Sequence, residues 1–517
     1  MYLCANYNDN IMSSKVRVRF APSPTGPLHI GGVRTALYNY LFAKKHGGDF
    51  LLRIEDTDQT RYVPGAEDYI IEALKWCGIS PDEGIGGEDR GNGPYRQSER
   101  KPMYMDYVNE LVANDKAYIA FDTAEELDQM RELAKAAGAA NWQYNYITRG
   151  NMKNSLTLPK EEVEAKIAAG EPYVVRIKLP RDHEVRFEDI IRGWVSVNTN
   201  NMDDKVLMKA DGMPTYHLAN IVDDHLMEIT HVIRGEEWLP SAPLHIMLYE
   251  AFGWESPSFA HLPLLLKPDG PGKLSKRDGD RLGFPVFPLE WTNPETGDVA
   301  SGYREFGFFP GSFLNMLALL GWNPGTEQEV FSLEELVQAF DLSKVSKSGA
   351  KFDFEKGKWF NQLYLRKLNE TELASLLKTE LDKAGYSINE AHLGKVATMM
   401  SERATFPQDL VNEGTYLFER PSAYDEKALK KWNDESPAMV GDLIARFDAL
   451  ENFTEAEIEA SFKAYLAEKE LGFGKVGPVF RLAVTGMGMG PSMFTICEVL
   501  GKKETLARMN AAVEALA

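Results

Sequence analysis

One stretch near the start of the chain combines a histidine with two glycines in a way that suits phosphate binding. It reads Arg19-Phe20-Ala21-Pro22-Ser23-Pro24-Thr25-Gly26-Pro27-Leu28-His29-Ile30-Gly31-Gly32. Gly31 and Gly32 would open a helix without side chains, where free N–H groups and the helix dipole attract an anion. His29 adds a donor for phosphate oxygens. A Pro/Gly turn with a capping histidine is the structural alternative for a short motif of this kind.

Two basic segments could neutralise charge on a phosphate. The first is Lys273-Leu274-Ser275-Lys276-Arg277, which follows the apolar stretch 262–266 beside several glycines that suit a closing loop. The second is Lys344-Val345-Ser346-Lys347-Ser348, which follows an expected capped helix away from any expected sheet edge. Because context confirms a motif better than spelling does, we favour the first segment. Leu274 stands where a P-loop needs Ser or Thr, which excludes that motif.

The elements around the histidine stretch alternate between strand and helix. Residues 16–20 have the two-residue period of a strand, and the apolar residues of 33–41 recur with helical spacing. A strand over 50–54, the acidic run 55–58 and a helix over 66–76 follow. This alternation predicts a parallel, doubly wound sheet whose ligands bind beyond the carboxyl ends of the strands.

The alternation lapses between about 95 and 201 and then resumes. Strands are expected at 214–222, 229–234 and 262–266, with a helix at 242–252. Beyond about 330, amphipathic helices dominate. The pattern predicts one sheet split by an inserted domain, followed by a helical C-terminal third.

The histidine stretch resembles the His-x-Gly-His signature of class I aminoacyl-tRNA synthetases. The residues Ala21 to Gly26 resemble the bacterial-type glutamyl-tRNA synthetases in particular, with Gly32 at the fourth signature position and His29 as the expected catalytic imidazole. The resemblance covers residues 15–517. It implies a Rossmann-like α/β domain with a doubly wound parallel sheet split by an α+β insert, then a stem-contact domain and an all-α anticodon-binding region.

By this resemblance the chain divides into five parts. They are an N-terminal extension at 1–14, a catalytic domain at 15–96 and 214–268, an acceptor-end-binding insert at 97–213, a lysine loop with an extra segment and stem-contact domain at 269–370, and anticodon-binding helices at 371–517. The extra segment Leu282–Gly302 would brace the lysine loop or cover the sheet. Aromatic burial habits favour a core role, over stacking on RNA bases, for Phe352, Phe354, Trp359 and Phe360.

Binding of glutamate calls for two cations and one anion, because the substrate carries two carboxylates and one ammonium. The resemblance implies that the glutamate contacts are Arg19, Ala21, Ser23, Glu55, Tyr216 and Arg234. It implies that the ATP contacts are His29, Gly31, Gly32, Glu237 and Lys276, and that the catalytic residues are His29, Lys273 and Lys276. Lys276 would neutralise charge on the β- and γ-phosphates, with Lys273 assisting.

The charged residues in and beside the acidic run 55–58 are expected to have mainly structural roles. Arg53 and Arg61 are expected to form ion pairs with it. Asp56 and Asp58 could hold a metal, but acids after a strand more often cap the next helix. Many family members carry Cys-x-Cys for zinc in the insert, whereas Ala120 and Asp122 stand at the corresponding positions here, so no zinc is expected.

The resemblance implies attachment of L-glutamate to the 3′ end of tRNA(Glu) with ATP and Mg²⁺, by a cytoplasmic monomer. Two alternatives stay open: an enzyme that also charges tRNA(Gln), and a synthetase-like RNA-binding protein without catalysis. A truncated paralogue that glutamylates a tRNA base is disfavoured by the helical C-terminal third.

Composition limits the class of protein. With 57 Lys+Arg against 77 Asp+Glu the net charge is −20, which argues against a non-specific nucleic-acid binder and leaves RNA recognition to local basic contacts. Cys4, Cys77 and Cys497 are too far apart in sequence for a metal knuckle, which favours a reducing compartment. No apolar run approaches the roughly 20 residues that span a membrane.

Overall fold

The computed structural model describes residues 15–138 and 142–516, so the expected N-terminal extension lies outside the described residues. The chain forms two compact units, Met1–Gly357 and Lys358–Ala517. Each is described by itself.

The first unit is built on a mostly parallel sheet, as the alternation of strand and helix predicted. Among the described residues its strand order is β3-β2-β1-β9-β10-β6-β7, and β7 alone runs antiparallel to its neighbour. The strands are β1 (Arg17–Phe20), β2 (Asp49–Leu52), β3 (Glu83–Gly84), β6 (Glu184–Asp189), β7 (Gly193–Asn198), β9 (His231–Gly235) and β10 (Ser258–Leu262).

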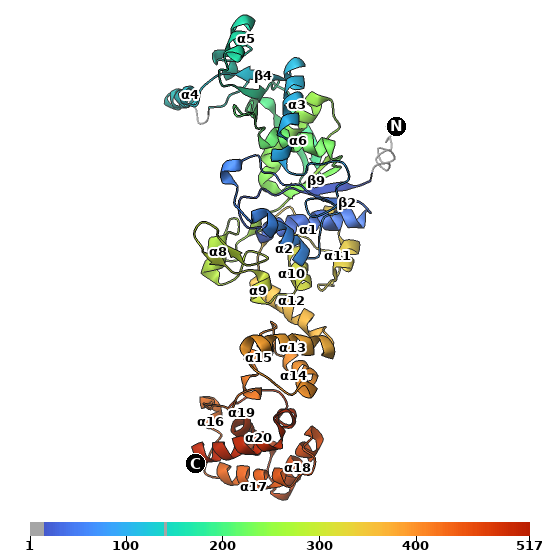
Figure 1. Cartoon of the computed structure of the whole chain (residues 1–517), viewed down its shortest axis with the longest axis vertical. Helices are drawn as coiled ribbons and strands as arrows, with labels where there is room; N and C mark the ends of the chain where they lie inside the picture. The colour runs from blue at the N-terminus through green and yellow to red at the C-terminus, as the bar shows by residue number, and fades with distance from the viewer. Residues whose placement is uncertain (1–14, 139–141, 517) are drawn as a thin grey trace, which may run out of the picture. The chain divides into compact units, whose positions relative to one another are not determined.

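Helices cover both faces of this sheet (Figure 1). One face carries α1 (Ile30–Lys45), α2 (Ala66–Trp76), α10 (Pro310–Ala318) and α11 (Leu333–Ala339), and the other carries α3 (Lys101–Ala113), α6 (Tyr216–Leu226) and α7 (Ala242–Phe252). Every residue of β1 and β2 is therefore buried, including Arg17 and Arg19. Central parallel strands are usually apolar throughout, and β1 departs from this because its two buried arginines pair with Asp49 and Asp224.

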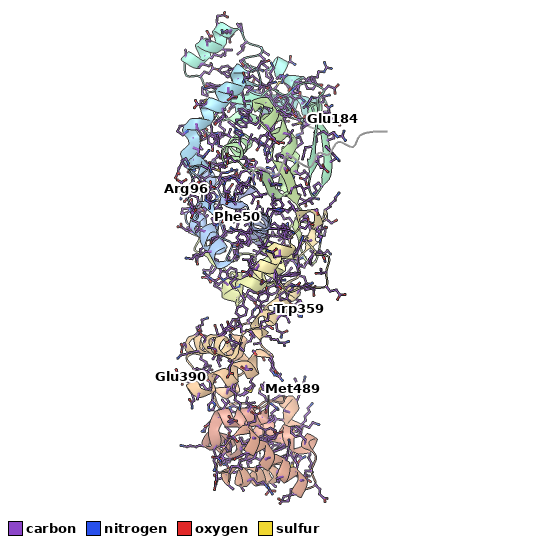
Figure 2. The ribbon with its side chains drawn as sticks, turned by 90° about the vertical axis from the view of Figure 1, so that its right-hand side faces the viewer. Phe50, Arg96, Glu184, Trp359, Glu390 and Met489 are labelled. Atoms are coloured by element: carbon purple, nitrogen blue, oxygen red, sulfur yellow. The ribbon has the colours of Figure 1, made fainter. Side chains whose placement is uncertain are left out.

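The residues expected to be the insert form a second, antiparallel sheet. Its strands are β4 (Ala117–Ala120), β5 (Val174–Ile177) and β8 (Val206–Met208), beside α4 (Ala124–Ala136) and α5 (Lys160–Ala168). The range 97–213 also contains the hairpin β6–β7, which extends the main sheet through the pair Phe259 and Asp189. In Figure 2, Glu184 on this hairpin and Arg96 lie on opposite sides of the first unit, with Phe50 between them.

The expected strand at 214–222 is wrong, because these residues form most of α6. Leu218, Ile221 and Val222 are buried, and so are the polar Asn220 and Asp224, so no exposed polar face marks the helical period. A short apolar run of this kind does not distinguish a strand from a buried helix.

The remainder of the first unit surrounds an aromatic core. It contains β11 (Leu265–Leu266), α8 (Lys276–Leu282), β12 (Trp291–Thr292), β13 (Val299–Ala300), α9 (Tyr303–Phe306) and β14 (Ala350–Lys351), and α12 (Phe354–Arg366) crosses into the second unit. Phe352 is buried and packs on Phe284, as does Phe354, so the core interpretation of these rings is confirmed. Phe360 is also buried, whereas Trp359 is 41% exposed.

The described part of the second unit consists of helices, as expected. They are α13 (Glu370–Ala384), α14 (Leu393–Ser401), α15 (Asp409–Asn412), α16 (Glu426–Leu429), α17 (Ser436–Asp448), α18 (Glu455–Glu468), α19 (Phe473–Thr485) and α20 (Met493–Leu516), the last interrupted at Gly501. Leu373, Leu377 and Leu381 form a buried stripe on α13, which ends at Gly385 with φ +75°. Within residues 15–138 and 142–516, no helix combines the length and apolarity needed to cross a bilayer.

Candidate active site

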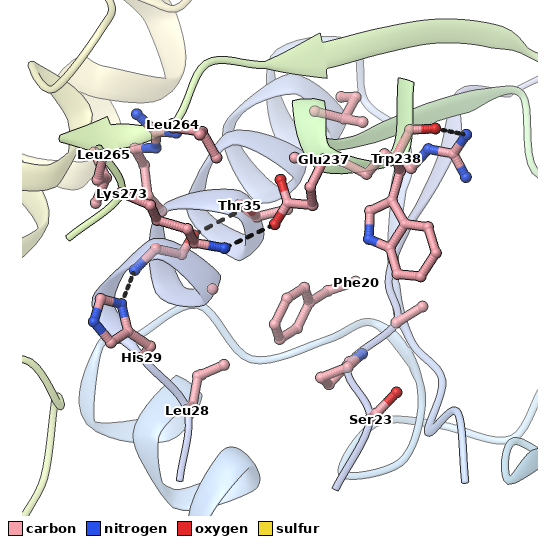
Figure 3. Close-up of a pocket in the computed structure, with 18 of the residues that line it drawn as sticks. Phe20, Ser23, Leu28, His29, Thr35, Glu237, Trp238, Leu264, Leu265 and Lys273 are labelled. Carbon is pink, nitrogen blue, oxygen red and sulfur yellow. Dashed lines mark hydrogen bonds and ion pairs between the residues drawn. The ribbon is translucent and has the colours of Figure 1, made fainter. Parts of the chain in front are cut away.

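A pocket of about 350 Å³ opens beyond the carboxyl ends of β1 and β9 (Figure 3). This is the edge at which ligands bind in doubly wound sheets. Eleven of the twelve residues that the sequence proposed for substrate contact or catalysis line it: Arg19, Ala21, Ser23, His29, Gly31, Gly32, Glu55, Tyr216, Arg234, Glu237 and Lys273. Lys276 does not.

His29 caps helix α1, as the structural alternative predicted, and also lines the pocket, so the capping role does not exclude a role in binding. Its Nδ1 accepts the backbone N–H of Gly31 at 3.2 Å, which leaves the ring proton on Nε2. Nε2 is buried and has no hydrogen-bond partner among the described residues. Burial and the charge of Lys273 lower the pKa of His29 to about 4. The ring is therefore a neutral N–H donor at pH 7.

Gly32 allows close packing within the loop. A Cβ there would lie 2.5 Å from Cδ1 of Leu28, whereas a Cβ on Gly31 would find only Nδ1 of His29 at 3.6 Å. Gly32 thus lets Leu28 fold back under the helix start. The backbone N–H of Gly31 donates to Nδ1 of His29.

The extra segment Leu282–Gly302 holds the start of α1 in place. The carbonyl of Val286 accepts the N–H of Ile30 at 2.9 Å, and the ring of Phe287 meets that of His29 edge-on at 6.2 Å. Val286 also packs against the position of Gly279, which lies inside α8 and is not part of the loop. The segment therefore connects the helix that follows the lysine loop to the histidine.

Arg19 and Glu55 belong to one buried ionic network. Arg19 donates to both oxygens of Asp224, and Arg53 pairs with Asp224 at 2.8 Å and with Glu55 at 3.0 Å. Asn220 also donates to Glu55, at 3.2 Å. The expected pairing of Arg53 with the acidic run is confirmed. Arg19 is thus largely neutralised within the protein.

Arg234 has a different environment. Its Nε donates to Nε2 of His261 at 3.0 Å, and its Nη1 donates to the hydroxyl of Tyr216 at 3.0 Å and lies 3.3 Å from Nδ1 of His245. No carboxylate among the described residues pairs with it. Since Arg234 is 5% exposed and lines the pocket, it offers an uncompensated positive charge to a substrate anion.

The first basic segment reaches the pocket and the second does not. Nζ of Lys273 pairs with Glu237 at 3.1 Å, and Lys273 lines the pocket (Figure 3). Lys276 is the first residue of α8, outside the lining. Lys347 instead contacts the backbone of Arg192. Residues 350–351, just beyond the second segment, pair with 265–266 in a separate two-stranded sheet that the sequence did not predict.

The acidic run has capping roles. Asp58 accepts the N–H of Thr60 and pairs with Arg61 at 2.6 Å, as expected for that arginine, while Asp56 accepts from Ser98. In the insert, Asp122 accepts from the hydroxyl of Tyr144 and from the backbone of Lys153. The residues that the structure describes contain no cluster of three or more His, Cys, Asp or Glu suited to a metal ion.

Sequence reasoning missed several side chains that hold the site. They are Asp189, Asn220, Asp224, His245 and His261, all buried polar residues. The available signal was a polar residue inside an apolar run, as in Phe259-Ala260-His261-Leu262. Such residues are buried with a partner or not at all, but the partners come from distant segments and cannot be read locally.

Comparison with known proteins places the chain in a family. Residues 15–359 match the class I (E and Q) tRNA synthetase catalytic domain, and residues 372–513 match an anticodon-binding domain. The chain is 57% identical to the glutamate–tRNA ligase of Flavobacterium johnsoniae over 505 residues, which cover 98% of this chain and 100% of that one. It is 58% identical to the enzyme of Bacteroides fragilis over 511 residues, covering 97% and 99%.

Solved structures agree with these matches. A crystal structure of a glutamate tRNA ligase from Elizabethkingia meningosepticum, in complex with its amino acid, superposes with a TM-score of 0.94 at 52% identity, covering 98% of this chain and all of that one. The glutamate–tRNA synthetase of Elizabethkingia anophelis gives 0.92 at 52% identity, over 97% and 100%. The chain therefore belongs to the bacterial glutamate–tRNA ligases of the class I (E and Q) aminoacyl-tRNA synthetase family.

Proposed function

We propose that this pocket activates L-glutamate with ATP and passes it to the 3′ end of tRNA(Glu), which is the activity of this family. One observation carries the assignment of the pocket. A buried imidazole with a free N–H, an exposed lysine and an arginine with no carboxylate partner line one cavity at the strand ends. These groups suit a substrate pair of triphosphate and dicarboxylate.

The nucleotide would bind at the start of α1. Nε2–H of His29 supplies a donor for a phosphate oxygen, and the helix dipole favours the negative charge. Lys273, already held at the pocket by Glu237, would exchange that partner for the phosphates. Lys276 would reach them only after the loop closes, because it lies outside the lining. Mg²⁺ enters as part of the substrate Mg–ATP.

The amino acid would bind between the two arginines. Glu55 supplies the anion for the α-ammonium. Burial raises the pKa of Glu55 even against the charges of Arg53 and Arg19, so an incoming ammonium would stabilise its ionised form. Arg19 and Arg234 supply the cations, with Ala21, Ser23 and Tyr216 around them.

The chemistry consists of two transfers. The α-carboxylate attacks the α-phosphorus of ATP, the bond to the β-phosphate oxygen breaks, and pyrophosphate leaves with the negative charge. A ribose hydroxyl of the terminal adenosine then attacks the acyl carbon, and AMP leaves as the hydroxyl loses its proton. The protein contributes positioning and charge stabilisation in both steps.

The assignment is tested by charging assays with purified tRNA(Glu) and tRNA(Gln). Attachment of glutamate to tRNA(Glu) that requires ATP is expected, and loss of charging in His29→Ala would assign it to this pocket. Full activity of that variant would overturn the pocket assignment. Charging of tRNA(Gln) as well would identify a non-discriminating enzyme, and charging of neither tRNA would refute the proposed function. We also infer a cytoplasmic monomer, which gel filtration with light scattering checks.

A further inference from the structure

Arg234 is held by neutral rings. A guanidinium has only donors, so Nε2 of His261 and Nδ1 of His245, the ring nitrogens that face it at 3.0 and 3.3 Å, must both be unprotonated acceptors. The backbone carbonyl of Trp238 and the hydroxyl of Tyr216 complete its partners. The positive charge is thus positioned without being neutralised, in contrast to Arg19 on Asp224.

Asp189 fixes the tautomer of His261. Nδ1 of His261 lies 2.6 Å from Oδ2 of Asp189, and both side chains are buried. An ionised carboxylate only accepts, so this bond keeps the ring proton on Nδ1 and turns the lone pair of Nε2 toward Arg234. Burial, with the nearby charge of Arg234, keeps the pKa of His261 below its ordinary value against the opposing effect of Asp189. The ring is therefore neutral.

Asp189 is held in turn by the edge hairpin. Its Oδ1 accepts the backbone N–H groups of Ile191 at 3.0 Å and Arg192 at 2.8 Å. The pairing of Asp189 with Phe259 brings the end of β6 beside β10, on which His261 stands. The β6–β7 hairpin thus places the carboxylate of Asp189 beside His261, which contacts Arg234.

His245 and His217 also hold Arg234 without neutralising its charge. Because Nδ1 of His245 faces Arg234, its proton is on Nε2, which lies 3.2 Å from Nδ1 of His217. Burial lowers the pKa of His217 to about 4 and that of His245 well below its ordinary value. Both rings are therefore neutral at pH 7 and add no charge to that of Arg234.

The carboxylate that meets Arg234 is the one remote from ATP. The reacting α-carboxylate must lie beside the phosphates, at His29 and Lys273. In Figure 3, Trp238, whose carbonyl accepts from Arg234, lies across the pocket from His29. The substrate's side-chain carboxylate is therefore the group at this end.

We propose that Asp189 and His261 are positioning residues for substrate selection, which hold Arg234 as an uncompensated cation so that a side-chain carboxylate is preferred to an amide. The inference rests on the proposed function and adds the physical basis of its choice of glutamate over glutamine. Tyr216 contributes, because its oxygen accepts from Arg234 and its own proton is left to donate. An amide nitrogen placed there would meet donors only, and buried unpaired donors are costly.

The variant Asp189→Asn tests the tautomer directly. The backbone N–H groups of Ile191, Arg192 and His261 all donate to Oδ1 and require an oxygen there, which forces the new amide nitrogen toward the ring of His261. His261 would then carry its proton on Nε2, against Nε of Arg234. We expect the KM for glutamate to rise about tenfold or more, the KM for ATP to stay within about twofold, and the preference for glutamate over glutamine to fall.

The rescue variant keeps the test independent of folding. In Asp189→Asn with His261→Gln, the glutamine oxygen can accept from Arg234 whatever the new amide at position 189 presents, so most of the lost glutamate affinity should return. His261→Leu, which offers no acceptor to Arg234, should raise the KM for glutamate as Asp189→Asn does. His231→Gln, at the other end of β9, is the matched control. Thermal unfolding of each variant separates loss of fold from loss of binding.

Two results would overturn the inference. One is an Asp189→Asn enzyme with wild-type KM and preference for glutamate. The other is a loss in which the KM values of glutamate and ATP rise together and the double variant recovers nothing, which would make the pair structural. A wild-type protein that charges no tRNA with glutamate would instead refute the proposed function.

Discussion

Arg19 and Asp224 form a buried ion pair with two hydrogen bonds, Nε to Oδ1 at 3.0 Å and Nη2 to Oδ2 at 3.2 Å. Arg53 shares the same carboxylate at 2.8 Å. Burial disfavours the charge on Asp224, but the two guanidiniums outweigh it and hold its pKa below the ordinary 3.8. Asp224 therefore serves both cations, as the carboxylate partner of Arg19 and as one of the partners of Arg53.

Asp224→Asn should destabilise the protein by about 3–5 kcal/mol, because it leaves the buried guanidinium of Arg19 without its counter-ion and removes one of the carboxylate partners of Arg53. Urea unfolding measures the change. Glu164→Gln, which removes an exposed partner of Lys160, is the control and should cost less than about 1 kcal/mol. Since the folded pKa of Asp224 is depressed, its contribution is present above pH 3.8 and is lost as the pH falls through the folded pKa. Equal effects of the two variants would contradict the network.

His29→Asn should lower the rate of adenylate formation by about 10²-fold, the usual cost of losing one donor to a developing charge. Because the pKa of His29 is about 4, the ring stays neutral from pH 5.5 to 8. The ratio of wild-type to variant kcat/KM for ATP should therefore be constant over that range. A ratio that changes with a midpoint near pH 6.5 would show instead that the protonated ring acts.

Lys273→Ala should lower adenylation by about 10²-fold with little change in the KM for glutamate. Lys347→Ala is the matched control, since that lysine contacts the backbone of Arg192 outside the pocket, and should stay within about twofold. Lys276→Ala should also lower the rate of adenylate formation if loop closure brings the Lys276 ammonium to the phosphates. Pre-steady-state measurement of adenylate formation ranks the three. A larger loss in Lys347→Ala than in Lys273→Ala would reverse the assignment.

Phe287→Ala should lower adenylation about three- to tenfold by freeing the ring of His29, a change of the size that one aromatic contact contributes. Val299→Ser, on an exposed residue of the same extra segment, is the control and should leave the rate unchanged. If both variants behave as wild type, the segment covers the sheet without positioning the histidine.

The loop and the first helix could be predicted because their determinants are local. The residues Pro22 to Gly32 combine turn formers with a helix start. Helix α2 ends at Trp76, just before Cys77 and Gly78, as its sequence indicated. The pairing of Asp189 with Phe259 could not be predicted, since it joins residues 70 positions apart. The same holds for Asp224 under Arg19. The sequence therefore predicted most of the polar side chains that line the pocket, and missed the buried groups that orient them.

The most direct test of the central claim is the transfer of labelled L-glutamate to purified tRNA(Glu) by the wild-type protein, measured beside Arg234→Gln. We expect ATP-dependent charging by the wild type with glutamine excluded. In the variant we expect a KM for glutamate raised about 10²-fold, as a buried charge-assisted contact is lost. Absence of charging by the wild type, or an unchanged KM in the variant, would contradict the account.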